Sequence, residues 1–160
     1  MSIEKRLQEL GIELPVYAND TYYGATKYGS MKPFHIIGNV LHLSGHVPER
    51  DGNVVHPGRL GETVTLQQGI EAARVTGINA MAGMKQALGD LDRVVGIVKS
   101  LNFVACAPDF HEVHKVSSGM TDMLAEVFGR DIGIGCRATI GIQALALNNC
   151  FETWMEVEFR

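Results

Sequence analysis

The stretch GDLDRVVGIVKSLNFVACAPDF (residues 89–110) decides the fold class, because it joins two helical patterns through one long apolar strand. Residues 94–107 are apolar and rich in β-branched side chains, which predicts the strand. Gly89 is placed to end a helix, and Pro108 to help open the next one. A helix–strand–helix order predicts crossover connections onto a sheet, and therefore an α/β fold.

The two helices flanking this strand have clear apolar periodicity. The first is predicted over residues 65–88, where small or apolar side chains recur every three or four positions. Its residues Ala73 and Gly77 are small, so we expect this helix to lie close to a sheet. The second helix is predicted to open near Asp109, which has the spacing of a capping box with Glu112.

Further strands are predicted on both sides of this unit. Residues 35–46 predict a hairpin with its turn at Gly38, and a short strand is expected near residues 54–55. Two strands are predicted over residues 136–144 and 150–159, joined by a turn at Asn148-Asn149. The expected architecture is a mixed six-stranded sheet with two main helices on one face.

The sheet predicted in this way has one face without helices. Two helices cover only one face of such a sheet, so a partner subunit is the simplest cover for the other. The 160 residues suit one domain, residues 1–160. Within it, residues 1–32 are expected to add a short helix and an ordered irregular segment.

Composition excludes several classes of function. The net charge of −4 argues against a large nucleic-acid footprint, and no apolar stretch reaches the roughly 18 residues of a membrane span. The N-terminus lacks the apolar core of a signal peptide. Three cysteines without a CxxC spacing favour reduced thiols in the cytoplasm over a disulfide framework, and Cys106 and Cys136 are expected to be buried.

Arg137 is an unusual charge on a strand that otherwise resembles core. Alternation places Arg137 and Thr139 on one face, and Ala138, Ile140 and Ile142 on a face that we expect to be interior. The planar fork of an arginine suits a carboxylate. From spacing alone, a structural ion pair at a subunit edge is the favoured alternative.

Two other groups could contribute chemistry. Glu152 shares a strand face with Trp154 and Glu156, and a carboxylate beside a pocket can position or deprotonate water. The alternative is a solvated acidic face. The hydroxyl of Ser44 and the backbone at Gly45 end a strand, on the face expected to hold His42 and His46, and could hold an anion. The alternative there is a simple turn.

A metal site is not expected. His111 and His114 lie three residues apart at the start of the second helix, and no third ligand is evident.

Several blocks of sequence, in this order and spacing, resemble the RidA family, also called YjgF or, in older usage, the endoribonuclease L-PSP family. The resemblance covers nearly the whole chain. It is carried by GNVLHLSGHVP (38–48), GDLDRVV (89–95), FVACAPDF (103–110), LAEVFG (124–129) and CRATIGI (136–142).

The resemblance implies a chorismate-mutase-like fold and a homotrimer whose sheets form an inner barrel, with sites in clefts between subunits. It implies hydrolysis of 2-imino or enamine acids to 2-keto acids and ammonia, with no metal or organic cofactor. The implied partners are a small carboxylate metabolite and further copies of the chain. A membrane or nucleic-acid partner is not implied.

The same resemblance assigns roles to residues. Arg137 aligns with the arginine that grips the substrate carboxylate, and Glu152 with the glutamate thought to position water. Ser44 and Gly45 align with a pocket serine and a backbone contact. Glu156 shares the face of Glu152, so a small register error would exchange the two.

Other pocket positions depart from the family pattern. Met31 falls where the family has a tyrosine, although Tyr28 is close by. Ser118 stands where the family has an asparagine, and His46 stands where it has a glutamine. At the position of Thr139, the family often has a cysteine. Three hypotheses follow: an imine or enamine deaminase, a non-catalytic module that binds a small carboxylate, and, ranked last, an endoribonuclease.

Overall fold

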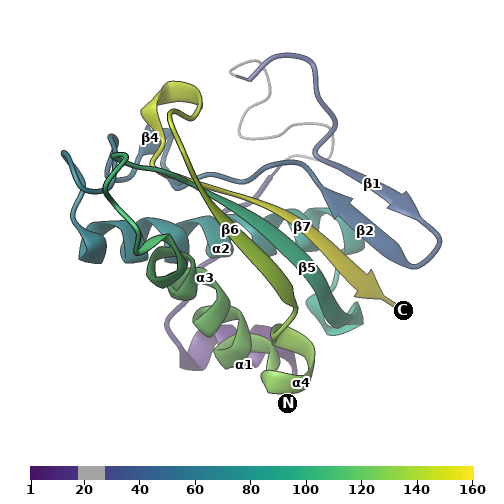
Figure 1. Ribbon diagram of the computed structural model, residues 1–160. Helices are drawn as coiled ribbons and strands as arrows, with labels where there is room; N and C mark the ends of the chain where they lie inside the picture. Colours follow the sequence, from purple (N-terminus) through teal and green to yellow (C-terminus); the bar gives the residue numbers. More distant parts are fainter. Residues whose placement is uncertain (18–27) are drawn as a thin grey trace.

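The chain forms a five-stranded mixed sheet with helices on one face, in a computed structural model that describes residues 1–17 and 28–160 (Figure 1). The strand order is β1-β2-β7-β5-β6. The strands are β1 (Phe34–Ile37), β2 (Val40–Leu43), β5 (Val94–Ala105), β6 (Cys136–Ile142) and β7 (Phe151–Phe159). The α/β class is confirmed. The sheet has five strands instead of six because β3 (Glu49–Arg50) and β4 (Asn53–Val54) pair only with each other.

The helices of the described residues are α1 (Ile3–Glu9), α2 (Leu66–Leu88), α3 (Val113–Phe128) and the short α4 (Arg130–Gly133), with 3₁₀ turns at Leu91–Arg93 and Ala146–Asn148. The observed bounds of α2 agree with the helix predicted over residues 65–88. Thr65 caps it by accepting from the Gln68 N–H at 3.2 Å, while the Gln68 side chain accepts from the Thr65 N–H at 2.9 Å. Gly89 ends it with a positive φ of 77°.

Helix α3 begins later than expected. It starts at Val113, and its N-cap Glu112 makes no side-chain capping bond, so the predicted capping box is wrong. The reason is a turn that precedes the helix, in which the Phe110 N–H donates to the carbonyl of Ala107 at 3.1 Å. The Glu112 carboxylate instead accepts from Lys115 one turn into the helix.

The C-terminal strand lies inside the sheet, not at its edge. Strand β7 pairs antiparallel with both β2 and β5, and β6 pairs parallel with the other side of β5 (Figure 1). The sequence predicted a turn at Asn148-Asn149 that joins two neighbouring strands. That prediction is wrong, because β5 lies between β6 and β7 and these residues carry the chain past it. Positive φ angles at Leu147 and Asn148 bend this connection.

The two faces of the sheet differ sharply. Helices α2 and α3 pack on the face that carries the buried side chains of β7, namely Phe151, Thr153, Met155 and Val157. Glu152, Trp154, Glu156 and Glu158 alternate onto the open face, as expected. The 54% exposure of Trp154 shows that the described residues leave this face uncovered.

The faces of β6 are the reverse of the expectation. Arg137 and Thr139 point to α3, while Ile140 is 45% exposed and Ala138 is also exposed on the open face. Alternation defined two faces correctly, but α3 packs on the polar one. Cys136 alternates onto the same open face and is exposed, contrary to expectation, whereas Cys106 is buried.

Two further expectations were wrong in detail. His46 does not share the open face, because β2 ends at Leu43 and the chain turns there. His46 is buried beside Gly83 of α2. Gly77 brings α2 close to α3 instead of the sheet, because a Cβ on it would meet the side chain of Met123 at 2.5 Å.

Candidate functional site

Arg137 is held against α3 by its guanidinium group. Its Nη1 donates to Thr121 Oγ1 at 2.8 Å and to Ser118 Oγ at 3.3 Å, and its Nη2 donates to the His114 carbonyl at 3.3 Å. These groups form the Arg137 cluster, defined as Arg137, Ser118, Thr121 and Thr139. Its hydroxyl partners are neutral, so the arginine keeps a net positive charge for an anionic ligand.

Thr139 supports this cluster from the same strand face. Its Oγ1 shares a hydrogen bond with Ser117 Oγ, which is fully buried on α3. This hydrogen bond between two hydroxyls links β6 to α3 at a position two residues after Arg137. Ser118, by contrast, donates to the His114 carbonyl at 3.1 Å and faces the guanidinium. The structure thus brings together three residues that the sequence singled out.

Glu152 lies against the backbone of Gly45. A Cβ built on Gly45 would stand 2.0 Å from Glu152 Oε1 and 2.8 Å from Trp154 Nε1, so only glycine lets the carboxylate come this close. Trp154 Nε1 donates to Glu152 Oε1 at 3.2 Å. Ser44 precedes this contact, and its hydroxyl donates to the Lys32 carbonyl. Ser44, Gly45, Glu152 and Trp154 form the Glu152 cluster.

The environment of Glu152 makes its carboxyl a weaker acid than that of an exposed glutamate. Burial raises the pKa of this carboxyl, and the hydrogen bond from Trp154 opposes the rise only in part. Glu156 differs, since it lies 3.4 Å from both His42 Nδ1 and Lys99 Nζ. Of the two acids that the sequence left exchangeable, Glu152 is the one beside Ser44-Gly45, and its raised pKa suits proton transfer.

Within one chain, the two clusters lie on opposite faces of the sheet. Arg137 pairs with Ser100, whose side chain is buried beneath the helices. Glu152 pairs with Phe103 on the open face, where the ring of Phe103 packs edge-on against Trp154 with centroids 6.0 Å apart. A ligand therefore cannot touch Arg137 and Glu152 of the same chain at once.

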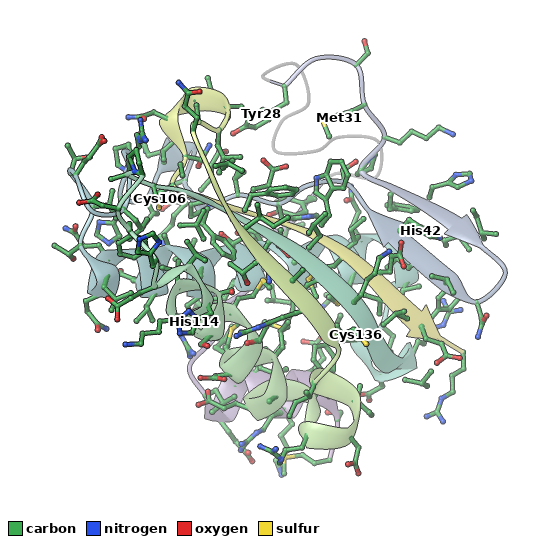
Figure 2. The ribbon with its side chains drawn as sticks, in the orientation of Figure 1. Tyr28, Met31, His42, Cys106, His114 and Cys136 are labelled. Atoms are coloured by element: carbon green, nitrogen blue, oxygen red, sulfur yellow. The ribbon has the colours of Figure 1, made fainter. Side chains whose placement is uncertain are left out.

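Tyr28 lies near the Glu152 cluster, and Met31 does not take part in it. Figure 2 shows Tyr28 beside the connection between β6 and β7, where Asn149 Nδ2 donates to its hydroxyl at 3.5 Å. The charge of Glu152 contributes to a raised pKa of Tyr28, after burial and the neighbouring Glu49. Met31 is exposed. The part of the irregular segment 15–32 that spans residues 18–27 lies outside the described residues.

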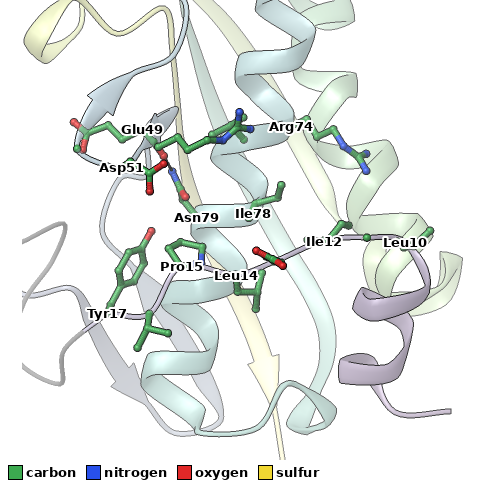
Figure 3. A pocket seen from close by; sticks show the side chains of 16 residues that line it. Leu10, Ile12, Leu14, Pro15, Tyr17, Glu49, Asp51, Arg74, Ile78 and Asn79 are labelled. Carbon is green, nitrogen blue, oxygen red and sulfur yellow. Dashed lines mark hydrogen bonds between the residues drawn. The ribbon is translucent and has the colours of Figure 1, made fainter.

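Neither of two hollows in the described part of the chain contains Arg137 or Glu152. One, of about 910 Å³, lies between the segment 10–17, the turn at 49–52 and α2 (Figure 3). Another, of about 770 Å³, lies at the end of β5 and includes Arg59 and Cys106.

Among residues 1–17 and 28–160, no group of three or more His, Cys, Asp or Glu side chains is arranged to hold a metal ion. His111 is exposed, and the carbonyl of His114 is used by Arg137. In the same described ranges, no helix combines the length and apolar character needed to cross a bilayer.

Sequence reasoning missed two members of these clusters, Thr121 and Trp154, and one further residue, Glu49. Thr121 lies one helical turn after Ser118, so helical spacing could have found it once Ser118 was singled out. Trp154 was placed on the correct face but given no role. Glu49, whose carboxylate accepts from Tyr28, carries no periodic or motif signal.

Comparisons with known proteins extend over nearly the whole chain. The model of the YjgF/chorismate mutase-like endoribonuclease family matches residues 4–156. Protein TCP17 of Trypanosoma cruzi is 36% identical over 156 residues, which cover 98% of this chain and 93% of that protein.

Solved structures give the same result. A protein of unknown function from Agrobacterium tumefaciens is 36% identical with a TM-score of 0.86, covering 99% of this chain and 92% of that one. A candidate endoribonuclease from Shewanella oneidensis is 30% identical with a TM-score of 0.89, covering 99% and 100%. E. coli TdcF with bound serine shares the fold at 13% identity, with a TM-score of 0.62 and coverage of 92% and 100%.

Proposed function

Because the chain belongs to the YjgF/RidA family and has its chorismate-mutase-like fold, we propose that it is a cytoplasmic homotrimer that hydrolyses 2-imino or enamine carboxylates. Each active site would lie in a cleft between two copies. The Arg137 cluster of one copy would bind the substrate carboxylate, and the Glu152 cluster of the next would direct water.

One observation carries this proposal: the arginine and the half-buried acid Glu152 lie on opposite faces of the same sheet. In a ring of identical copies, one surface of each copy meets a different surface of its neighbour. The Arg137 cluster of one copy and the Glu152 cluster of the next would then complete a site at every interface. The uncovered face supports this assembly, because Ile140 and Trp154 are large apolar side chains left exposed by one chain. β6 also presents a free strand edge.

The chemistry needs only positioning and one acid–base group. The guanidinium of Arg137 would hold the carboxylate through two parallel N–H donors, after exchanging its hydroxyl partners for the ligand. Water would add to the C=N carbon while Glu152 takes up a proton, and the same carboxyl would return the proton to the departing nitrogen. A protonated imine and one water then give a ketone and an ammonium ion, with no other reactant.

The test uses 2-iminobutanoate generated in situ by a dehydratase. Wild type should accelerate the appearance of 2-oxobutanoate over the buffer reaction, and Arg137→Ala should lose that acceleration while the trimer persists in light scattering. Glu71→Gln, which removes an exposed charge on α2, is the matched control and should keep full activity. If 2-oxobutanoate appears no faster with wild type than in buffer alone, the deaminase proposal is wrong.

A second candidate is a non-catalytic module that binds a small carboxylate in the same cleft. The hydrogen bond from Trp154 to Glu152 favours it, because this donor occupies a carboxylate oxygen that would otherwise activate water. The serine bound to TdcF supports a small amino acid as a ligand class. Thermal shifts with 2-keto or 2-amino acids, without product formation, would select this candidate. RNA cleavage lost in a site variant would instead support the endoribonuclease.

A further inference from the structure

The hollow of about 770 Å³ at the end of β5 lies where α/β folds commonly bind ligands, and the proposed hydrolysis does not use it. β5 and β6 are parallel neighbours, their pairing ends at Ala105 and Ile142, and the connection between them contains α3. The hollow lies beyond these carboxyl ends, beside Val113, the first residue of α3. In open α/β sheets, ligands bind in the crevice outside the carboxyl ends of the strands. We call this space the Arg59 hollow, after the arginine that lines it.

The Arg59 hollow is separate from the Arg137 cluster. Arg137 is the second residue of β6, whereas the hollow begins at Gly141 on the same strand. Four residues of strand, at about 3.3 Å each, put about 13 Å between the two positions. Figure 2 shows the same separation, since Cys136, next to Arg137, and Cys106, in the hollow, lie at opposite ends of the β5–β6 pair. A ligand in the hollow would therefore leave Arg137 unoccupied.

Arg59 brings a cationic donor to this hollow. Its Nη2 donates to the Cys106 carbonyl at 2.6 Å, which fixes the guanidinium against the end of β5. Its Nε is buried and has no hydrogen-bond partner within residues 1–17 and 28–160. The Glu62 carboxylate lies 3.6 Å from this Nε, too far for a hydrogen bond. A buried N–H without an acceptor is costly, so an anionic oxygen placed here would stabilise the protein.

Glu62 occupies the position that such an anion would take. Its side chain is 46% exposed, and an exposed ion pair of this kind is worth only about 0–1 kcal/mol. The carboxylate can therefore turn out into water at little cost and leave the guanidinium to a ligand. The contact between Arg59 and Glu62 shows at the same time which ligand chemistry this site accepts, namely a negatively charged oxygen.

The other walls of the hollow are of two kinds. The side chains of His111 and Gln143 line it and form no hydrogen bond with any residue in the described part of the chain. Three apolar side chains, Phe110, Val113 and Ile142, form the remaining wall. A volume of about 770 Å³ lies in the range of small-molecule sites, which are largely apolar with a few placed polar groups. An anion that carries an apolar group matches both kinds of wall.

We propose that the Arg59 hollow binds the phosphate group of a small organic phosphate ester. Arg59 would bind phosphate oxygens in place of Glu62, and the apolar wall would hold the organic group of the ester. The phosphate of an ester has three free acceptor oxygens, so it can accept from Arg59, His111 and Gln143 at once. No side chain caps the first N–H groups of α3, which adds donors at the same end of the hollow.

Calorimetry on the assembled protein would compare phenyl phosphate, inorganic phosphate and benzoate. Phenyl phosphate should bind about tenfold more tightly than the other two, because inorganic phosphate lacks the ring and benzoate lacks the third oxygen. Arg59→Met should weaken phenyl phosphate about tenfold or more, since a charge-assisted hydrogen bond is lost. Arg130→Met removes an exposed arginine just past the other end of α3 and, as the matched control, should keep the Kd within twofold.

Glu62→Gln tests the site in the opposite direction and does not disturb a buried contact. It removes the competing charge, so phenyl phosphate should bind about threefold more tightly. The proposal is wrong if Arg59→Met keeps the wild-type Kd, or, should that variant not fold, if Glu62→Gln does. It is also wrong if inorganic phosphate or benzoate binds as tightly as phenyl phosphate. Arg137→Ala should leave this binding unchanged, and a loss there would place the anion in the cleft instead of the hollow.

Discussion

Replacing Gly45 by alanine should displace the Glu152 carboxylate without disturbing the fold. The new Cβ would stand 2.0 Å from Glu152 Oε1. An ordinary carbon–oxygen contact is about 3.3 Å, so the oxygen has to move by about 1.3 Å. Because the obstructing atoms belong to the side chains of Glu152 and Trp154 on the open sheet face and none of the three nearest is backbone, we expect the loss of folding stability to be only about 1 kcal/mol.

The functional effect should be much larger than the structural one. A misplacement of about 1 Å in a positioned group can cost about a hundredfold in rate, so kcat/KM for imine hydrolysis should fall by roughly that factor. A second measurement does not depend on activity. Trp154 is the one tryptophan of the chain, and its 3.2 Å bond to Glu152 should break, which shifts its fluorescence emission.

Gly96→Ala is the matched control. Its Cβ would lie on the same sheet face, 3.8 Å from Glu158 Oε2, at ordinary contact distance, so rate and emission should both stay unchanged. A double variant with Glu152→Gln should be no worse than Glu152→Gln alone, because both changes act on one carboxylate. The reasoning fails if Gly45→Ala keeps the wild-type rate and the wild-type emission.

Three further predictions concern stability and ligand binding. Burial lowers the pKa of His46 from 6.5 to about 4, so its neutral form stabilises the fold above pH 6.5. About 3 kcal/mol should be lost as the pH falls from 6.5 to 4, and urea unfolding of His46→Gln should lack this dependence. Gly119→Ala should cost about 3 kcal/mol or more in urea unfolding, because its Cβ would stand 2.2 Å from the carbonyl oxygen of Ile70. Gly77→Ala should cost less, because its close contacts, at 2.5 and 2.9 Å, are with the side chains of Met123 and Met120, and backbone lies at 3.7 Å. Arg137→Lys should weaken carboxylate binding about tenfold in calorimetry, since it keeps the charge but loses the fork.

Elements that depend on local signals were predictable from the sequence. The cap of α2 needs only Thr65 and Gln68, and the turn between β1 and β2 needs only Gly38, whose φ is 60°. The apolar run of β5 was equally clear. Such features are fixed by residues within one or two turns of each other, so a pattern in the chain is enough to locate them.

Features that depend on packing were not predictable. Alternation along β6 separated Arg137 from Ile140 correctly, but it could not tell which side α3 would cover. The contact between Gly45 and Glu152 requires β7 to lie beside β2, although these strands are far apart in sequence. The pairing of Tyr28 with Glu49 has no periodicity at all, and only the fold reveals it.

The place of β7 in the sheet has a consequence for biosynthesis. Strand β7, the last of the five sheet strands to be synthesised, becomes the partner of both β2 and β5, and its Phe151, Met155 and Val157 lie in the core. Until residues 151–159 emerge, the hairpin of β1 and β2 has no neighbour, and the long β5 exposes an unpaired edge. Translation adds about 5–20 residues per second, so a nascent chain spends seconds with α2 and α3 made and its sheet still split. We therefore expect this interval, rather than the folded state, to be when the protein most needs a chaperone.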